Sequence, residues 1–457
     1  MTADLRTPST APGRLPLLGH AVPLIRDRLA FIQSLRAHGP VVRITVGPKS
    51  VTVVNSPELI HEMLTSKADQ FSKGLLFEKL KLFGKDALPV AEGRAHLHRR
   101  RQLQPAFHRE KISGYVDSMR ETVTPTVAGW HAGAELDLKA EMQLMAQNVV
   151  MSALFSSTPE SGAAHAILES VDTVFTAALR RALLPVSVLE KLPTRGNRQV
   201  KVANGVLRAA VAEILAEHRA NPDAYDDMVS LLLTVEDGDG QPLSDDEILS
   251  EITGLLAAGS ETTAVVVAWL FYELGRNPDL EHRLHEELDA VLGGEPVTAE
   301  HLGRLTFTRR LLNETLRLYS PAWLVTRQAL APVRLGPVEL PAGADLVWSP
   351  FALHRDPDLY PDPERFDPDR WLPERPQPPK GAFIPFGSGK RMCIGDAFAS
   401  TEAMVITAVI ASRWRLRPTR PDAVRPIGEI TVHPSSLQVA VENRLTAGRH
   451  AHAGRTA

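Results

Sequence analysis

Apolar residues recur at intervals of three and four between Arg94 and Leu292, which predicts a series of amphipathic helices. Two stretches rich in proline, glycine or polar residues, Leu183–Arg198 and Asp237–Ser244, interrupt the pattern. In Ser244-Asp-Asp-Glu247 the serine and glutamate have the spacing of a helix capping box. No proline follows until Pro278, so we expect one helix of about 32 residues. Its nearly continuous apolar content predicts that much of it is buried.

Strand patterns are short and occur in two regions. Val41–Val46 and Val51–Val54 alternate across GPKS, which predicts a β-hairpin, and Ser56–Thr65 should form a helix. The pattern of Phe71–Gly93 is irregular and predicts a long loop with one short helix. Further short strands are expected between Val325 and Val347. The chain is therefore predicted to be mainly α, with a small β-rich lobe.

Composition indicates a soluble globular protein. The 457 residues are 44% hydrophobic and 23% charged, and a net charge of −3 argues against nucleic acid as the main partner. Prolines interrupt the apolar residues near the N-terminus, which predicts neither a membrane anchor nor a signal peptide. A single cysteine permits no internal disulfide and fits a cytoplasmic location. No linker is visible, so we expect one domain over residues 1–457, with residues 1–13 and 445–457 disordered.

The only cysteine, Cys393, lies in the segment Phe383–Ala399. Glycine and proline before it favour a tight loop, and the apolar pattern after it predicts a helix. A sulfur at the start of a helix faces free backbone N–H groups, which favour the thiolate and a role as axial ligand of haem iron. The alternative for a lone cysteine is a small buried apolar residue. The segment contains the pattern F-x-x-G-x-R-x-C-x-G, formed by Phe386, Gly389, Arg391, Cys393 and Gly395.

This segment resembles the haem-ligand loop of the cytochrome P450 family. The resemblance implies the cytochrome P450 fold, haem b as cofactor, and Cys393 as the axial ligand, with Phe386, Arg391 and Gly395 in the cofactor site. It also implies a monooxygenase, which inserts one atom of dioxygen into an organic substrate and releases the other as water.

Within the long helix, Ala258-Gly-Ser-Glu-Thr-Thr263 places a glycine, an acid and hydroxyl groups in mid-helix. Taken alone, the segment can be a tolerated polar patch. A mid-helix threonine can also bond to the carbonyl four residues earlier and bend the helix. The segment is similar to the P450 oxygen-binding motif, in which the helix opens locally and an acid–alcohol pair relays protons. That likeness assigns Glu261 as the acid and Thr262 as the alcohol.

Glu314 and Arg317 form an E-x-x-R pattern, which by itself is usually a solvated helix pair. A second motif, Pro363-Glu-Arg365-Phe366, follows later in the sequence. In the P450 family, such a glutamate and arginine join the arginine of the later segment in a buried charge network. The resemblance therefore implies that Glu314, Arg317 and Arg365 support the haem core.

The two haem propionates need cationic or hydrogen-bonding partners. The segment Gly93–Phe107 looks like the propionate-binding helix of the family, although HLHRRR alone can be a solvated basic face. The likeness assigns this role to His96, Arg100, Arg327 and Arg391. His98, Arg99 and Arg101 crowd the same region and leave the assignment among them open. Their excess positive charge also suggests a docking face for an acidic electron carrier.

No zinc-protease, nucleophile-elbow or Walker motif occurs, and no flavin or nicotinamide domain is appended. Electrons are therefore expected from NAD(P)H through a separate ferredoxin or flavodoxin and its reductase. One alternative is a peroxide-driven P450, although such members usually lack the acid–alcohol pair. Another is a haem-thiolate sensor or binding protein without turnover.

The substrate is expected to be a hydrophobic small molecule. Segments near Trp323 and Trp371 resemble those of bacterial P450s that oxidise sesquiterpenes, which suggests a cyclic sesquiterpene from secondary metabolism. A macrolide, another polyketide or a fatty acid is the alternative. The pocket should draw on the 73–92 loop and Phe175–Leu192, among other segments. Its apolar lining is predicted to comprise Leu75, Phe77, Leu255, Ala258, Trp323, Leu324 and Ile430.

Overall fold

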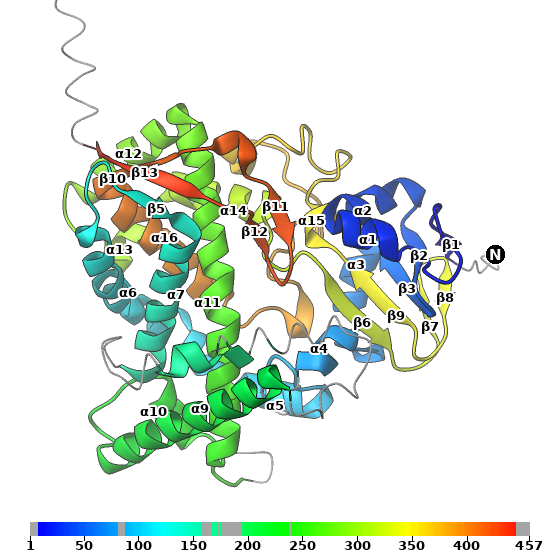
Figure 1. Ribbon diagram of the computed structural model, residues 1–457, viewed down its shortest axis with the longest axis horizontal. Coiled ribbons are helices and arrows are strands. Elements are labelled where there is room, and N and C mark those ends of the chain that lie inside the picture. The colour runs from blue at the N-terminus through cyan, green and yellow to red at the C-terminus, as the bar shows by residue number, and fades with distance from the viewer. Residues whose placement is uncertain are drawn as a thin grey trace, which may run out of the picture.

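In the computed structural model, helices form one side of the molecule and a β-rich lobe forms the other (Figure 1). The structure describes residues 8–80, 87–156, 166–171, 173–174, 177, 194–236 and 240–444. The predicted mainly α architecture with a small β lobe is confirmed.

Helix α11 (Asp245–Arg276) crosses the helical side of the molecule, as Figure 1 shows. It has the predicted 32 residues, and Ser244 and Glu247 form the predicted capping box. Among the described residues, α11 alone is long and apolar enough to span a membrane, but 67% of its apolar window is buried inside the protein. It is therefore the central core helix.

Helices α6 (Arg109–Gly129), α7 (Leu138–Phe155), α12 (Pro278–Leu292), α14 (Thr306–Leu318) and α16 (Asp396–Arg413) pack with α11 around one core. A Cβ atom at Gly259 would lie 3.0 Å from Cγ2 of Val150, so the mid-helix glycine lets α7 approach α11 closely. The other helices are α1 (Ala21–Arg26), α2 (Arg28–Ser34), α3 (Pro57–Leu64), α4 (Leu75–Leu80), α5 (Gly93–Leu103), α9 (Arg195–Ala220), α10 (Met228–Thr234), α13 (Ala299–Leu302) and α15 (Pro350–Leu353).

The β lobe contains a six-stranded sheet in the order β1-β2-β3-β9-β6-β4. The predicted hairpin is β2–β3, with Val42 opposite Val53. Residues 8–13 correct an expectation, because β1 pairs in parallel with β2 and this part of the N-terminal segment is ordered. Residues 1–7 and 445–457 lie outside the described residues. The strands are β1 (Ser9–Thr10), β2 (Val41–Val46), β3 (Lys49–Val54), β4 (Phe71–Ser72), β6 (Val325–Ala329) and β9 (Asp345–Trp348).

The described residues also form three smaller sheets. Of these, the β11–β12 hairpin lies beside α11, to which Trp269 anchors it by donating to the Val432 carbonyl at 2.9 Å. The smaller sheets are β10 (Trp414–Pro418), β13 (Gln438–Asn443) and β5 (Glu135–Asp137); β11 (Pro426–Gly428) and β12 (Val432–Pro434); and β7 (Val333–Leu335) and β8 (Val338–Leu340).

Candidate active site

The loop before α16 fixes the position of Cys393. The Cys393 N–H donates to the Phe386 carbonyl at 2.9 Å, and the Gly395 N–H donates to the sulfur. Gly389 has a φ angle of +70°, and a Cβ there would lie 2.1 Å from the Leu64 carbonyl oxygen. Glycine is therefore required at this turn, both for its backbone conformation and for space.

The electrostatics at Cys393 differ from the sequence-based expectation. Burial raises the pKa of the Cys393 thiol, whereas the Gly395 N–H and the Arg100 guanidinium lower it. The Gly395 N–H therefore acts on the Cys393 pKa in the predicted direction, but desolvation acts against it and is the larger effect. A coordinated metal cation reverses that balance, since it binds the thiolate.

Four predicted propionate contacts come from three segments and gather near this loop. Burial is the main cause that lowers the pKa of His96 to about 3. The positive charges that add to this effect belong to Lys73, Arg391, Arg100 and Arg327. The first of these, Lys73, was not anticipated from the sequence.

Lys73 is only 5% exposed, and burial lowers its pKa to about 7. Its Nζ donates to the carbonyls of Leu88 at 2.8 Å and Pro89 at 2.7 Å. No motif marks Lys73, and a lysine before a glycine normally indicates an exposed turn. Only the tertiary structure shows it as part of the site.

Glu92 is the carboxylate within this group of cations. It accepts hydrogen bonds from the Lys73 N–H and from Arg391 at 3.0 Å. Burial also lowers the pKa of Arg327, to about 10, and that of Arg391. The described residues thus gather more buried positive than negative charge beside Cys393. This donor set fits a ligand with two carboxylates, as haem has.

The three basic residues of α5 whose roles the sequence left open are now distinguished. Arg99 pairs with Glu247 and Glu251 on α11, each at 3.0 Å, so it ties α5 to the core helix. His98 lies near the Glu236 carbonyl, and Arg101 is exposed. None of the three is among the charges that shift His96.

The proposed acid–alcohol pair lies in the middle of α11. Thr262 donates to the Ala258 carbonyl at 2.9 Å, as the sequence predicts. Glu261 accepts from the buried Thr431 hydroxyl at 2.7 Å, a partner that was not anticipated. The helix is continuous from 245 to 276, so the expected local opening is not seen. The Ala258 carbonyl can accept a second bond without losing its helical one, because it has two lone pairs.

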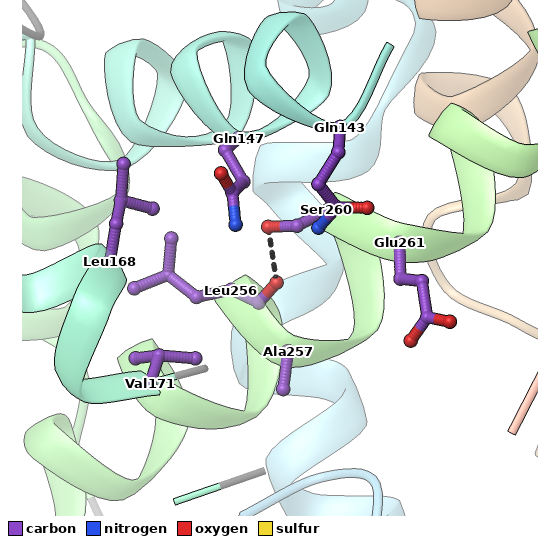
Figure 2. Close-up of a pocket in the computed structure, with 8 residues that line it drawn as sticks. All are labelled: Gln143, Gln147, Leu168, Val171, Leu256, Ala257, Ser260 and Glu261. Atoms are coloured by element: carbon purple, nitrogen blue, oxygen red, sulfur yellow. Dashed lines mark hydrogen bonds between the residues drawn. The ribbon is translucent and has the colours of Figure 1, made fainter. Parts of the chain in front are cut away.

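A small cavity of about 30 Å³ lies between α7, residues 168–171 and α11. Gln143 and Gln147 extend from α7 toward Ser260, while the Glu261 carboxylate points away from them (Figure 2). Two glutamines four residues apart on an otherwise apolar helix face were the available signal for this pocket. Besides Glu261, it is lined by Gln143, Gln147, Leu168, Val171, Leu256, Ala257 and Ser260.

The residues predicted to line the substrate pocket are not among these. Ala258 is exposed, Leu75 is 42% exposed, and Leu255, Leu324 and Ile430 are half-buried. Phe77 is also half-buried, and its ring centre is 5.8 Å from Nζ of Lys73. The segment Phe175–Leu192 lies outside the described residues except for Ala177.

Trp323 is likewise not among the residues that line this cavity. It is 8% exposed within the main core, and its indole N–H donates to the Glu429 carbonyl at 2.8 Å. Glu429 lies in the turn that also carries Ile430 and Thr431. The Trp323 ring fills space in the core, and its indole N–H anchors the β11–β12 turn.

Glu314 and Arg317 are fully buried and form a bidentate pair at 2.8 and 3.0 Å. Arg317 also donates to the Arg365 carbonyl at 3.1 Å, but the Arg365 side chain is exposed. The prediction that the Arg365 side chain completes the network is wrong. Two other side chains complete the network instead: Arg370 lies 3.5 Å from Glu314, and Trp371 donates to Glu314 at 2.9 Å.

The comparisons with known proteins agree with this geometry. The cytochrome P450 family model matches residues 8–441. The chain is 40% identical to cyclooctat-9-en-7-ol 5-monooxygenase of Streptomyces melanosporofaciens over 90% of each chain. It is 39% identical to pentalenene oxygenase of Streptomyces avermitilis over 96% of this chain and 97% of the relative.

Solved structures show the same fold. A crystal structure of a cytochrome P450, CYP102L1, superposes with a TM-score of 0.85 at 25% identity, covering 96% of this chain and all of the other. Retinoic acid-bound cyanobacterial CYP120A1 gives a TM-score of 0.84 at 24% identity with the same coverage. The chain belongs to the cytochrome P450 family of haem monooxygenases.

Proposed function

We propose that the protein hydroxylates a compact cyclic terpene, with a cyclic sesquiterpene as the first candidate. The main observation in support of a haem enzyme is the cluster of buried cations beside the single cysteine. Relatives named for pentalenene and cyclooctat-9-en-7-ol support the terpene class. In this proposal Leu255, Leu324 and Ile430, which are half-buried and offer no hydrogen-bonding group, face an apolar substrate outside the cavity described above.

In this proposal Cys393 ligates the iron of haem b, and His96, Lys73, Arg100, Arg327 and Arg391 hold its propionates. Thiolate-ligated haem supplies the reductive activation of dioxygen. Electrons come from NAD(P)H through a ferredoxin or flavodoxin and its reductase, and the protein works in the cytoplasm.

The chain's own contribution is to position the substrate and move protons. Glu261 holds its carboxylate at the Thr431 hydroxyl, 2.7 Å away, which fixes its direction. Thr262 donates its hydroxyl proton to the Ala258 carbonyl, so its oxygen keeps lone pairs that can accept a hydrogen bond and hold a proton donor in place. We propose that Glu261 supplies the protons and Thr262 orients them.

The test is a reconstituted reaction with NADPH, a ferredoxin and its reductase, offered cyclic terpenes, a macrolide and a fatty acid. Terpene hydroxylation coupled to NADPH oxidation is expected. Thr262→Ala should still accept electrons but release peroxide in place of product, and Glu261→Gln should slow turnover. Productive binding of the macrolide with no response to any terpene would exclude the substrate class. Unchanged coupling in both variants would exclude the proton relay.

A further inference from the structure

The turn between β11 and β12 presents a hydroxyl group to the proposed acid of the proton relay. Thr431 is 3% exposed, and its hydroxyl donates to the Glu261 carboxylate at 2.7 Å. Figure 2 shows that this carboxylate points away from the α7 glutamines. A threonine hydroxyl can donate to a carboxylate and can also accept from a carboxylic acid. The contact can therefore persist when Glu261 takes up a proton and when it releases one.

Two buried indole groups hold this turn, one at each end. Trp323 donates to the Glu429 carbonyl at 2.8 Å, and Trp269 of α11 donates to the Val432 carbonyl at 2.9 Å. Both tryptophans are buried, so water competes little for either hydrogen bond. Thr431 lies between the two anchored carbonyls, and its position is therefore fixed from both sides.

The two indole groups are themselves held by their surroundings. The Ser349 hydroxyl donates to the Trp323 carbonyl at 2.6 Å. The Trp269 ring stacks on the Tyr319 ring, with the ring centres 4.0 Å apart and the planes 5° from parallel. Side chains whose conformations are fixed by packing and hydrogen bonds can hold a functional group in one geometry. The hydroxyl that meets Glu261 is thus supported from the core by side chains with little freedom.

We propose that Thr431 is a positioning residue for Glu261, and that Trp323 acts on the same acid through the turn. This inference rests on the proposed function, because it requires Glu261 to supply protons. It assigns Trp323 to proton supply and not to the substrate pocket, which is the role that the sequence suggested. A pocket residue affects substrate affinity and product identity, whereas a positioning residue of the relay affects turnover at unchanged substrate affinity.

The experiment compares Thr431→Val and Thr431→Ser in the reconstituted reaction. The probe is a cyclic sesquiterpene, or whichever offered substrate the wild type hydroxylates. Valine has a similar shape but no hydroxyl, so turnover should fall about tenfold, the effect of one lost hydrogen bond to a charged group. The solvent deuterium isotope effect should rise, because proton transfer becomes slower. The dissociation constant of the probe should not change, and serine should recover most of the turnover.

Trp323→Phe keeps an aromatic ring in the core but removes the indole N–H. Its turnover should fall about threefold with the same product, since the turn loses one of its two anchors. The matched control is Trp414→Phe, because the buried Trp414 also donates to a backbone carbonyl, that of Val127 near the end of α6, at 3.0 Å. Both variants should lose similar stability in thermal unfolding, but only Trp323→Phe should slow turnover.

Wild-type turnover and isotope effect in Thr431→Val would overturn the proposal, and so would a new product from Trp323→Phe. If Thr431→Val does not fold, Glu261→Asp tests the same contact, since its carboxylate is one methylene too short to reach the hydroxyl. An isotope effect as in wild type would again overturn the proposal. Glu261→Gln separates the two kinds of failure. Slow turnover in Glu261→Gln with normal turnover in Thr431→Val excludes only the positioning role, whereas normal turnover in Glu261→Gln excludes the proposed proton relay itself.

Discussion

Glu314 accepts hydrogen bonds from Arg317, Trp371 and the Asp367 backbone while fully buried. A buried charge with this many donors is costly to leave alone, because the remaining cation has no water to replace its partner. The side chains around it should therefore differ sharply in their effect on stability.

Glu314→Ala should lower the free energy of unfolding by about 3–5 kcal/mol, and Arg370→Ala by about 1–3 kcal/mol. Arg365→Ala is the matched control and should stay within about 0.5 kcal/mol, since only its backbone carbonyl takes part. Denaturant unfolding measures all three. An Arg365→Ala variant as unstable as Arg370→Ala would contradict the observed network.

Glu402 on α16 is fully buried, and neither carboxylate oxygen has a hydrogen bond of normal geometry. Burial raises its pKa to about 8, a shift that nearby Thr263 opposes. Between the ordinary carboxyl pKa and pH 8, the folded protein therefore holds a proton that the unfolded chain releases. The free energy of unfolding consequently falls as the pH rises through that range.

Glu402→Gln should remove this contribution, because an amide does not titrate. Its stability relative to wild type should increase from pH 5 to pH 8, measured as the difference in Tm at each pH. A constant difference across the range would show that Glu402 is ionised in the folded protein.

These residues also show what sequence can and cannot predict. The pattern P-x-R occurs at both Arg365 and Arg370, and nothing local says which side chain turns inward. Lys73 joins the cation cluster only because loop 87–92 and β6 fold over it. Motifs predicted Cys393 and its loop, whereas burial of single charges depends on distant segments.

At the scale of elements, the ends of α11 could be predicted from the sequence, unlike the burial of single charges. Its start at the capping box and its end before Pro278 were predicted correctly, because both signals are local. Its packing is not local. The need for glycine at position 259 comes from Val150 of α7, because the Cγ2 atom of Val150 would lie 3.0 Å from an added Cβ.

Gly259→Val should destabilise the protein by about 1–3 kcal/mol, because the added methyl groups overpack the contact between α7 and α11. Val150→Ala in the same chain should recover part of that loss by making room. Unfolding of the two single variants and the double variant gives the coupling energy. Strictly additive effects would mean that the helices do not meet at this point.

At the scale of the whole molecule, one core cluster runs from Ala11 to Val441. This continuity supports the proposal that the chain is a single domain. The cation cluster also combines distant parts of the sequence, because its members come from Lys73, α5, β6 and the cysteine loop. Haem binding should therefore stabilise the complete fold, because the haem-bound form gains contacts with all four segments.

Lys73→Gln should weaken haem binding by about tenfold, because it removes a charge-assisted contact but keeps a hydrogen-bond donor. Stability of the haem-free protein should not fall, since the excess positive charge is reduced. Haem transfer to apomyoglobin and thermal unfolding of the haem-free form measure the two effects. Lys390→Gln, which removes a lysine paired with the exposed Asp69, is the control. Equal haem transfer from both variants would remove Lys73 from the site.

The β11–β12 turn has a consequence for engineering by directed evolution. Over three consecutive positions it offers a carbonyl to Trp323, the half-buried side chain of Ile430 and a hydroxyl to Glu261. If Glu261 supplies protons as we propose, a mutant library that randomises the whole turn to obtain new products would also disturb this acid, and we expect most of its members to be inactive for that reason. Saturating Ile430 alone, with Thr431 retained, separates product choice from catalytic competence.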